Sequence, residues 1–105
     1  MCLLKFNIYA QQITVDPSSN FSYNHAGSKE YSQAYFAFSS EWDNCVKVAS
    51  FWQGKNEYAV LIENNECYIP PEVLSKTGFK ISVIGQSDNY RITTNRLLVK
   101  LEVDK

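Results

Sequence analysis

The sequence predicts an all-β protein, namely an antiparallel β-sandwich, immunoglobulin-like or similar, with about eight short strands. Three observations lead to this fold class. Residues that favour strands are abundant, because 7 Tyr, 6 Phe and 2 Trp accompany many Val, Ile and Thr. Apolar residues recur with a period of two in several short segments. Turn residues separate these segments about every ten positions. A small closed barrel is the alternative arrangement of the same strands.

The N-terminal third combines alternating strands with a long polar segment. The first predicted strand has one apolar face, formed by Cys2, Leu4, Phe6 and Ile8. A short strand over 13–15 follows it. The segment 16–32 is rich in Ser and Asn and shows no steady period, so a functional or mobile loop is predicted there.

The middle of the chain predicts a central strand and a hairpin. The segment 34–38 is apolar on both faces, which is typical of a strand inside a sheet. Strands over 46–52 and 57–62 are separated by a short turn in which Gly54 can supply a positive φ. These two strands are therefore expected to form a β-hairpin.

The C-terminal part predicts three strands and one helical turn. A short strand over 67–69 ends at Pro70, and a helical turn is expected near 71–75. The segment 79–83 alternates without interruption. The last strand, 97–103, is expected to turn its alternate residues inward, namely Leu97, Val99, Leu101 and Val103.

Length and charge exclude several classes of function. The 105 residues suit a single domain over 1–105, which can also be the N-terminal module of a longer chain. The balance of 10 Lys and Arg against 11 Asp and Glu argues against nucleic-acid binding and against a polybasic membrane-surface module. No apolar run reaches the ~20 residues of a membrane span, and the chain does not start like a signal peptide. We expect synthesis in a cytosol, with Cys2, Cys45 and Cys67 as free thiols.

Residues with catalytic potential are few and scattered. His25 is the only histidine, and no nucleophile motif accompanies it. The acidic pairs Glu63 with Glu66 and Glu41 with Asp43 flank turns, where solvated carboxylates are far commoner than a glycosidase pair. No Cys or His residues show zinc-ligand spacing, and no glycine-rich phosphate loop is present. The sequence therefore predicts a protein that is not an enzyme and has no metal or cofactor.

The candidate contact residues are Trp42 and Leu98. Trp42 stands among polar residues, so its ring either stays exposed for a ligand such as a sugar or folds back to plug one end of the sandwich. Leu98 lies between inward-facing residues of the last strand, on the face that should meet solvent. Trp52 ends a strand and is expected to pack in the core or against the hairpin.

Several segments, taken in order, resemble one known family. The most distinctive are I-P-x-E-V-L at 69–74, V-x-G at 83–85 and R-x-x-T-N at 91–95, and these follow the strand and turn at 34–43. They are similar to the N-terminal domain of phage and prophage baseplate or fibre proteins of Gram-positive hosts, the baseplate upper protein family. The resemblance covers roughly residues 31–103; the loop 16–32 and Cys45 depart from it.

The resemblance implies a non-enzymatic virion module that attaches a tail, baseplate or fibre protein to the particle. Its partner would be a second copy of itself or another virion protein, and it would pass from the host cytoplasm into the virion. Leu74 is expected to plug one end of the sandwich, and Arg91 and Asn95 to bind backbone carbonyls. Two other hypotheses stay open, a carbohydrate-binding sandwich that uses exposed aromatic residues and a small enzyme or inhibitor.

Overall fold

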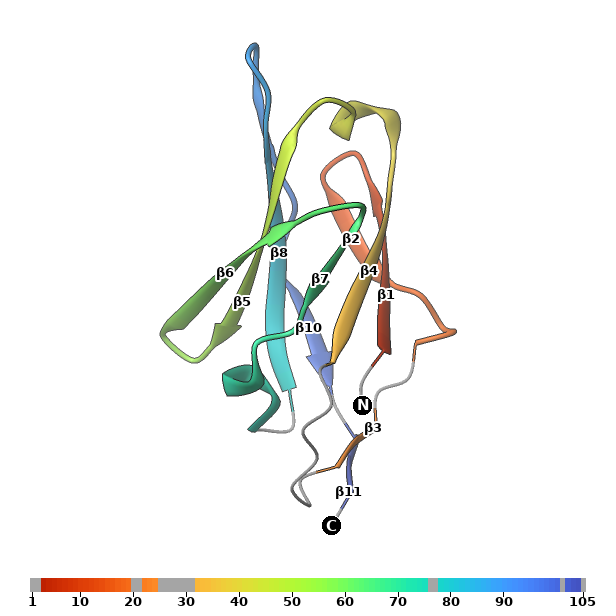
Figure 1. Cartoon of the computed structure of the whole chain (residues 1–105), viewed down its shortest axis with the longest axis vertical. Helices are drawn as coiled ribbons and strands as arrows, with labels where there is room; N and C mark the ends of the chain where they lie inside the picture. The colour runs from red at the N-terminus through yellow and green to blue at the C-terminus, as the bar shows by residue number, and fades with distance from the viewer. Residues whose placement is uncertain (1–2, 20–21, 25–31, 76–77, 101, 105) are drawn as a thin grey trace.

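The structure of the chain is a computed structural model that describes residues 3–19, 22–24, 32–75, 78–100 and 102–104. These residues form two facing β-sheets, shown in Figure 1, together with a small third sheet. Two 3-10 turns, η1 (Ser40–Trp42) and η2 (Pro71–Ser75), are the helical elements of the described residues. The predicted all-β sandwich and the predicted helical turn near 71–75 are confirmed.

The first sheet is mixed and has the strand order β2-β1-β4-β7. Its members are β1 (Leu3–Tyr9), β2 (Gln12–Val15), β4 (Gln33–Phe38) and β7 (Glu66–Tyr68). Strand β1 pairs antiparallel with β2 but parallel with β4. The prediction of purely antiparallel pairing is therefore wrong for this sheet. The first residues of β1 and β4 are paired, because the chain returns to the starting end of β1 before it enters β4.

The second sheet is antiparallel throughout, with β9 and β10 on the same side of β8. The order is β10-β8-β5-β6, and the strands are β5 (Val46–Gln53), β6 (Asn56–Ile62), β8 (Gly78–Gln86), β9 (Arg91–Thr93) and β10 (Leu97–Lys100). The predicted hairpin is present as β5 and β6, and Gly54 in its turn has a φ of 61°.

A third, two-stranded sheet joins β3 (Ser22–Asn24) to β11 (Glu102–Asp104) in parallel. Part of the segment predicted as a loop is thus a strand, and residues 20–21 and 25–31, including His25, lie outside the described residues. The predicted last strand is divided into β10 and β11, with residue 101 not described. The described strands number eleven rather than about eight, because short strands with one or two inward residues carry almost no periodic signal.

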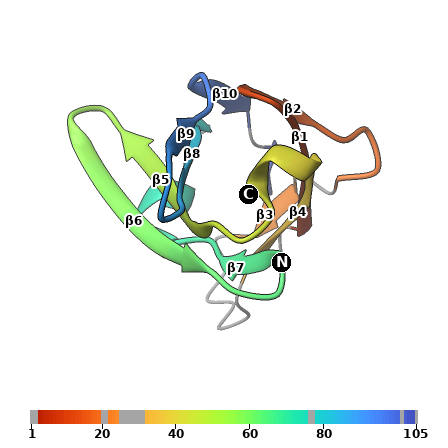
Figure 2. The same cartoon turned by 90° about the horizontal axis from the view of Figure 1, so that it is seen from above.

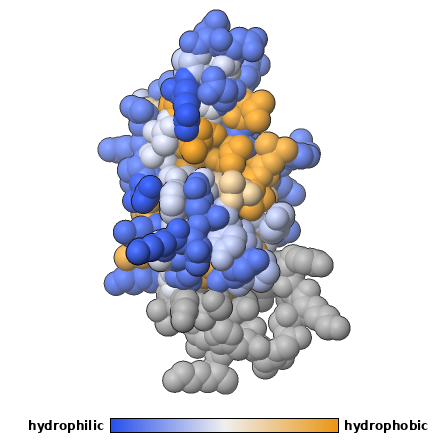
Figure 3. Space-filling view, turned by 90° about the vertical axis from the view of Figure 1, so that its left-hand side faces the viewer, coloured by the Kyte–Doolittle hydropathy of each residue, from blue (hydrophilic) through white to orange (hydrophobic). Residues whose placement is uncertain are grey.

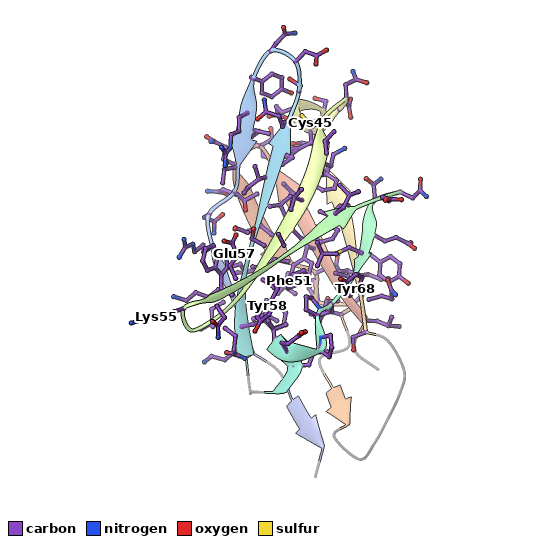
Figure 4. The ribbon with its side chains drawn as sticks, turned by 60° about the vertical axis from the view of Figure 1, so that its left-hand side comes forward. Cys45, Phe51, Lys55, Glu57, Tyr58 and Tyr68 are labelled. Atoms are coloured by element: carbon purple, nitrogen blue, oxygen red, sulfur yellow. The ribbon has the colours of Figure 1, made fainter. Side chains whose placement is uncertain are left out.

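The core lies between the two main sheets. Each sheet contributes a pair of phenylalanine rings, since the ring centroids of Phe6 and Phe36 are 5.5 Å apart and those of Phe51 and Phe79 are 5.6 Å apart. Figure 4 shows Phe51 pointing into the sandwich. Val99 is buried and Leu97 partly buried, as predicted for alternate residues of the last strand. Burial of each large apolar side chain contributes about 1.5–3 kcal/mol.

The edges of the two sheets meet without forming a closed barrel. Figure 2 shows β10 beside β2 and β7 beside β6. The contact of β10 with β2 depends on Asn95, whose backbone N–H donates to the Gln11 carbonyl at 3.2 Å and whose side-chain oxygen accepts from the Ile13 N–H at 3.1 Å. Asn95 therefore binds backbone groups, as predicted, but its side chain acts as an acceptor. Leu74 is buried in η2, at the end of the sandwich where it was expected.

Candidate interaction surface

The five-stranded sheet has one side that points away from the core, and we call this side the outer face. Paired residues of neighbouring strands share a face, so Val48 of β5 stands between Leu61 of β6 and Ile84 of β8. Their neighbour Ala49 turns to the other side and is fully buried. The alternation of side chains along β5, β6 and β8 therefore decides which residues lie on the outer face.

The centre of the outer face is apolar. We call Val46, Val48, Leu61 and Ile84 the apolar patch. Val46 is 62% exposed and Leu61 50% exposed, while Val48 and Ile84 are half-buried. Figure 3 shows a continuous hydrophobic area on this side of the molecule. The largest contiguous apolar patch on a monomeric soluble protein is often functional, and larger patches with a polar rim are typical of protein-interaction sites.

A stacked pair of side chains borders the apolar patch. The guanidinium carbon of Arg96 lies 4.0 Å from the centroid of the Trp52 ring. The Trp52 indole N–H is buried and has no hydrogen-bond partner among the described residues. Lys80 and Leu98 line the same hollow, whose volume is about 240 Å³, and Leu98 is 55% exposed. Of the two positions expected for Trp52, the core is therefore wrong, because the ring lies on the outer face of the β5–β6 hairpin against Arg96.

Charges of opposite sign occupy the two margins of the outer face. Strand β6 and its end carry the exposed acids Glu57 and Glu63. The opposite margin is basic and carries Lys80, Arg91, Arg96 and Lys100, on β8, β9 and β10 and just before β10. Figure 4 shows Glu57 on the twisted hairpin of β5 and β6. An apolar centre between charged margins is the common anatomy of a protein interface.

Trp42, the other predicted contact residue, does not lie on the surface. Its side chain is 0% exposed, its indole N–H donates to the Ala10 carbonyl at 2.8 Å, and its ring centroid is 5.3 Å from that of Phe38. The interpretation of Trp42 as an exposed contact is wrong, and the interpretation as a plug of the sandwich end is confirmed. The polar residues around it form η1, which folds the ring inward.

Sequence reasoning identified Leu98 on the outer face but missed the apolar patch. Leu61 lies in the run Val60-Leu61-Ile62, and Ile84 follows Val83. Consecutive apolar residues in a strand indicate that both of its faces are apolar, so this signal was available. The second apolar face of β6 meets solvent, since Leu61 is 50% exposed while Val60 and Ile62 are buried. Arg91, expected to bind a carbonyl, is exposed on the basic margin.

The acidic pairs and the thiols do not assemble a reactive site in the part of the chain that is described. Glu63 and Glu66 pair through their backbones across a turn, and both side chains are exposed. No three potential metal ligands cluster among the described residues. Cys45 and Cys67 are free thiols, and burial raises the pKa of Cys67 to about 12, so its thiolate is scarce at neutral pH.

Two comparisons with known proteins return no relative. A scan against protein-family models finds no match to this chain, and a search of curated proteins finds none either. Within the described residues, no helix is long and apolar enough to cross a membrane. Function is therefore inferred from the outer face and from the sequence motifs.

Proposed function

We propose that this chain is a non-enzymatic attachment module that binds a protein partner through the outer face of its five-stranded sheet. The observation that carries the proposal is the apolar patch, in which Val46 and Leu61 keep half or more of their surface exposed. Exposed β-branched and leucine side chains provide contact area at a low entropic cost. The charged margins would orient the partner and exclude others.

We further propose that the attached protein belongs to a phage or prophage particle. The motifs at 69–74, 83–85 and 91–95 resemble those of baseplate and fibre attachment domains. In the structure these motifs form η2, the end of β8 and β9, so two of the three border the outer face. On this proposal the chain is made in the host cytoplasm and then becomes part of the virion.

The test is capture of identified virion proteins from bacterial lysates that contain the particle. The tagged 105-residue chain is the bait, together with two matched variants, Leu61→Asp on the outer face and Tyr68→Asp on the mixed sheet. The two side chains are equally accessible, at 50% and 51%. We expect tail or baseplate proteins with the wild type and with Tyr68→Asp, and at least about tenfold less with Leu61→Asp. Equal capture by both variants, or none by the wild type, contradicts the proposal.

Carbohydrate binding is a second candidate, and one observation favours it on the opposite side of the molecule. Tyr35 and Tyr68 lie on the neighbouring strands β4 and β7, diagonally across the ladder, and are 36% and 51% exposed. Such rings can stack on the apolar face of a sugar. Binding on a glycan array that disappears in Tyr68→Ala but persists in Leu61→Asp would support this candidate. Trp42, on which the sugar hypothesis first depended, is buried.

A further inference from the structure

We propose that the outer face binds a second copy of this chain, in a symmetric dimer whose two-fold axis runs parallel to the strands between β5 and β8. This inference rests on the proposed function, because it names the partner of the same face. It follows from the order of residues across the sheet, which can be read from the strand register. Four rows of outward residues cross the sheet.

The strand register places the residues of the outer face in rows. The top row runs from Val46 through Gln86 to Arg91. Glu63 comes directly after Ile62, the last residue of β6 that pairs with β5, and forms a bridge to Glu66. The second row consists of Leu61, Val48, Ile84 and Thr93, and the third of Ala59, Ser50 and Ser82. The bottom row consists of Glu57, Trp52, Lys80 and Leu98. The rows therefore run from the β6 side of the sheet towards the β9 and β10 margin.

A two-fold axis parallel to the strands reverses each row and keeps its height along the strands. Strand β6 of one copy then lies over β9 and β10 of the other, and β5 lies over β8. An axis perpendicular to the strands, in the plane of the interface, would instead place β6 over β6 and the basic margin over itself. Like charges placed opposite each other across an interface are strongly unfavourable, so the charges favour the parallel axis.

The selected axis matches charges at both ends and apolar groups in the middle. Glu63 faces Arg91 of the second copy at the top of the sheet. At the bottom of the sheet, Glu57 faces Leu98 of the second copy. In that copy, Leu98 lies between the cations Arg96 and Lys100. In the second row, Val48 of each copy faces Ile84 of the other. Because the interface is isologous, every such pair occurs twice.

The size of the outer face predicts a weak dimer. Four strands at ~4.8 Å spacing and eight residues at ~3.3 Å each give a face of about 500 Å² per copy. The total of about 1,000 Å² lies just below the ~1,200 Å² where stable interfaces begin. Two sheets packed in this way keep their strands within about 30° of each other. We therefore expect dissociation in the micromolar range or weaker, and sedimentation that depends on protein concentration.

Charge reversal tests the axis directly. The variant Glu57→Lys/Glu63→Lys makes both margins basic, and the variant Lys80→Glu/Arg91→Glu/Lys100→Glu makes both acidic; Arg96 is left unchanged because it stacks on Trp52. Analytical ultracentrifugation of the 105-residue chain should show a monomer–dimer equilibrium for the wild type. Each charge variant alone should be monomeric, and an equimolar mixture should regain dimers. Far-UV circular dichroism verifies that both variants are folded.

Other outcomes would overturn the proposed dimer, its axis or its identity as the partner. A wild type that stays monomeric up to millimolar concentration excludes it, and so does a dimer that survives Leu61→Asp as well as Tyr68→Asp. A mixture of charge variants that stays monomeric excludes the parallel axis. Capture of an identified virion protein through the outer face by a monomeric chain would retain the proposed function while replacing its partner. Loss of both self-association and capture would remove both proposals.

Discussion

The indole N–H of Trp42 donates a hydrogen bond to the carbonyl of Ala10 at 2.8 Å, so a 3-10 turn between the sheets is tied to the first hairpin. The Ala10 N–H in turn donates to the Ser39 hydroxyl at 2.9 Å. Gly85 of β8 packs directly against the indole ring of Trp42. One buried side chain therefore connects both main sheets at the same end of the sandwich.

Replacement of Trp42 by phenylalanine should destabilise the protein markedly. The smaller ring leaves a cavity and removes the donor to the Ala10 carbonyl, and an unmade buried hydrogen bond alone costs about 1–3 kcal/mol. Trp42→Ala should cost about 3–5 kcal/mol. Urea unfolding followed by far-UV circular dichroism measures both values. A loss below about 0.5 kcal/mol in Trp42→Phe, within the range of ordinary surface substitutions, would show that Trp42 does not hold the sheets together.

Substitution of Gly85 by alanine tests the same contact from the other side. A Cβ at this position would lie 2.8 Å from Cε3 and Cζ3 of Trp42 and 3.0 Å from Cγ2 of Ile92. Overpacking of this kind costs about 1–3 kcal/mol. In the Trp42→Phe background the cost should be smaller, because contacting residues are not additive. Equal costs in the two backgrounds, measured by the same urea titration, would mean that the clash is relieved elsewhere.

Ala10→Gly should stabilise the protein. Ala10 is the first residue of the two-residue turn between β1 and β2 and has a φ of 52°, whereas Gly54 takes the corresponding place between β5 and β6 with a φ of 61°. A left-handed conformation costs an L-residue about 1–2 kcal/mol, which exceeds the entropy that glycine adds to the unfolded chain. We expect a net gain of about 0.5–1 kcal/mol. Ala10→Val serves as the control and should be less stable than the wild type.

The carboxyl of Asp16 should titrate far below its usual range. Its Oδ1 accepts hydrogen bonds from the backbone N–H and the hydroxyl of Ser18, at 2.9 and 2.7 Å, and its Oδ2 accepts one from Asn7 at 3.1 Å. These bonds lower the pKa of Asp16 from 3.8 to about 2. Since the folded pKa is below the unfolded one, the stabilisation is complete above about pH 3.8 and disappears as the pH falls through about 2.

Carbon NMR of the Asp16 carboxyl across this range measures the pKa shift. Ser18→Ala removes the hydroxyl but keeps the backbone N–H, which is the larger cause of the shift. The pKa of Asp16 should therefore rise only part of the way towards 3.8 in the Ser18→Ala variant. A midpoint near 3.8 in the wild type would show that the turn around Asp16 is open in solution.

Much of the fold could be predicted from the sequence, because alternation and turn residues are local signals. The hairpin at Gly54, the turn that begins at Pro71 and the inward Val99 all depend on neighbours within a few positions. The parallel pairing of β1 with β4 depends on where the chain returns after β2, which no local period encodes. The burial of Trp42 depends on a carbonyl 32 residues away, so its polar neighbours suggested a surface position instead.

The candidate surface was only half predictable for the same reason. Leu98 is the outward residue between the two inward residues of an alternating strand, and alternation identifies such a position. Leu61 and Ile84 form the patch only because the register places both of them beside Val48. Sequence periodicity shows that a strand has two apolar faces, but only the order of strands decides which face is covered.

Cys67 should resist alkylation in the folded protein, whereas Cys45 should react. Cys67 is buried on β7, and burial raises its pKa to about 12. The reagent therefore cannot reach the sulfur, and the reactive thiolate is scarce. Cys45 is half-exposed, and its sulfur lies 3.8 Å from the Tyr90 hydroxyl. Mass spectrometry after iodoacetamide treatment of a Cys2→Ser variant at about pH 8 should therefore show Cys45 modified first. In denaturant both thiols should react at similar rates, which provides the control. If Cys67 reacts as fast as Cys45 without denaturant, then the edge of the mixed sheet opens readily, and the sandwich is less closed at β7 than its hydrogen bonds indicate.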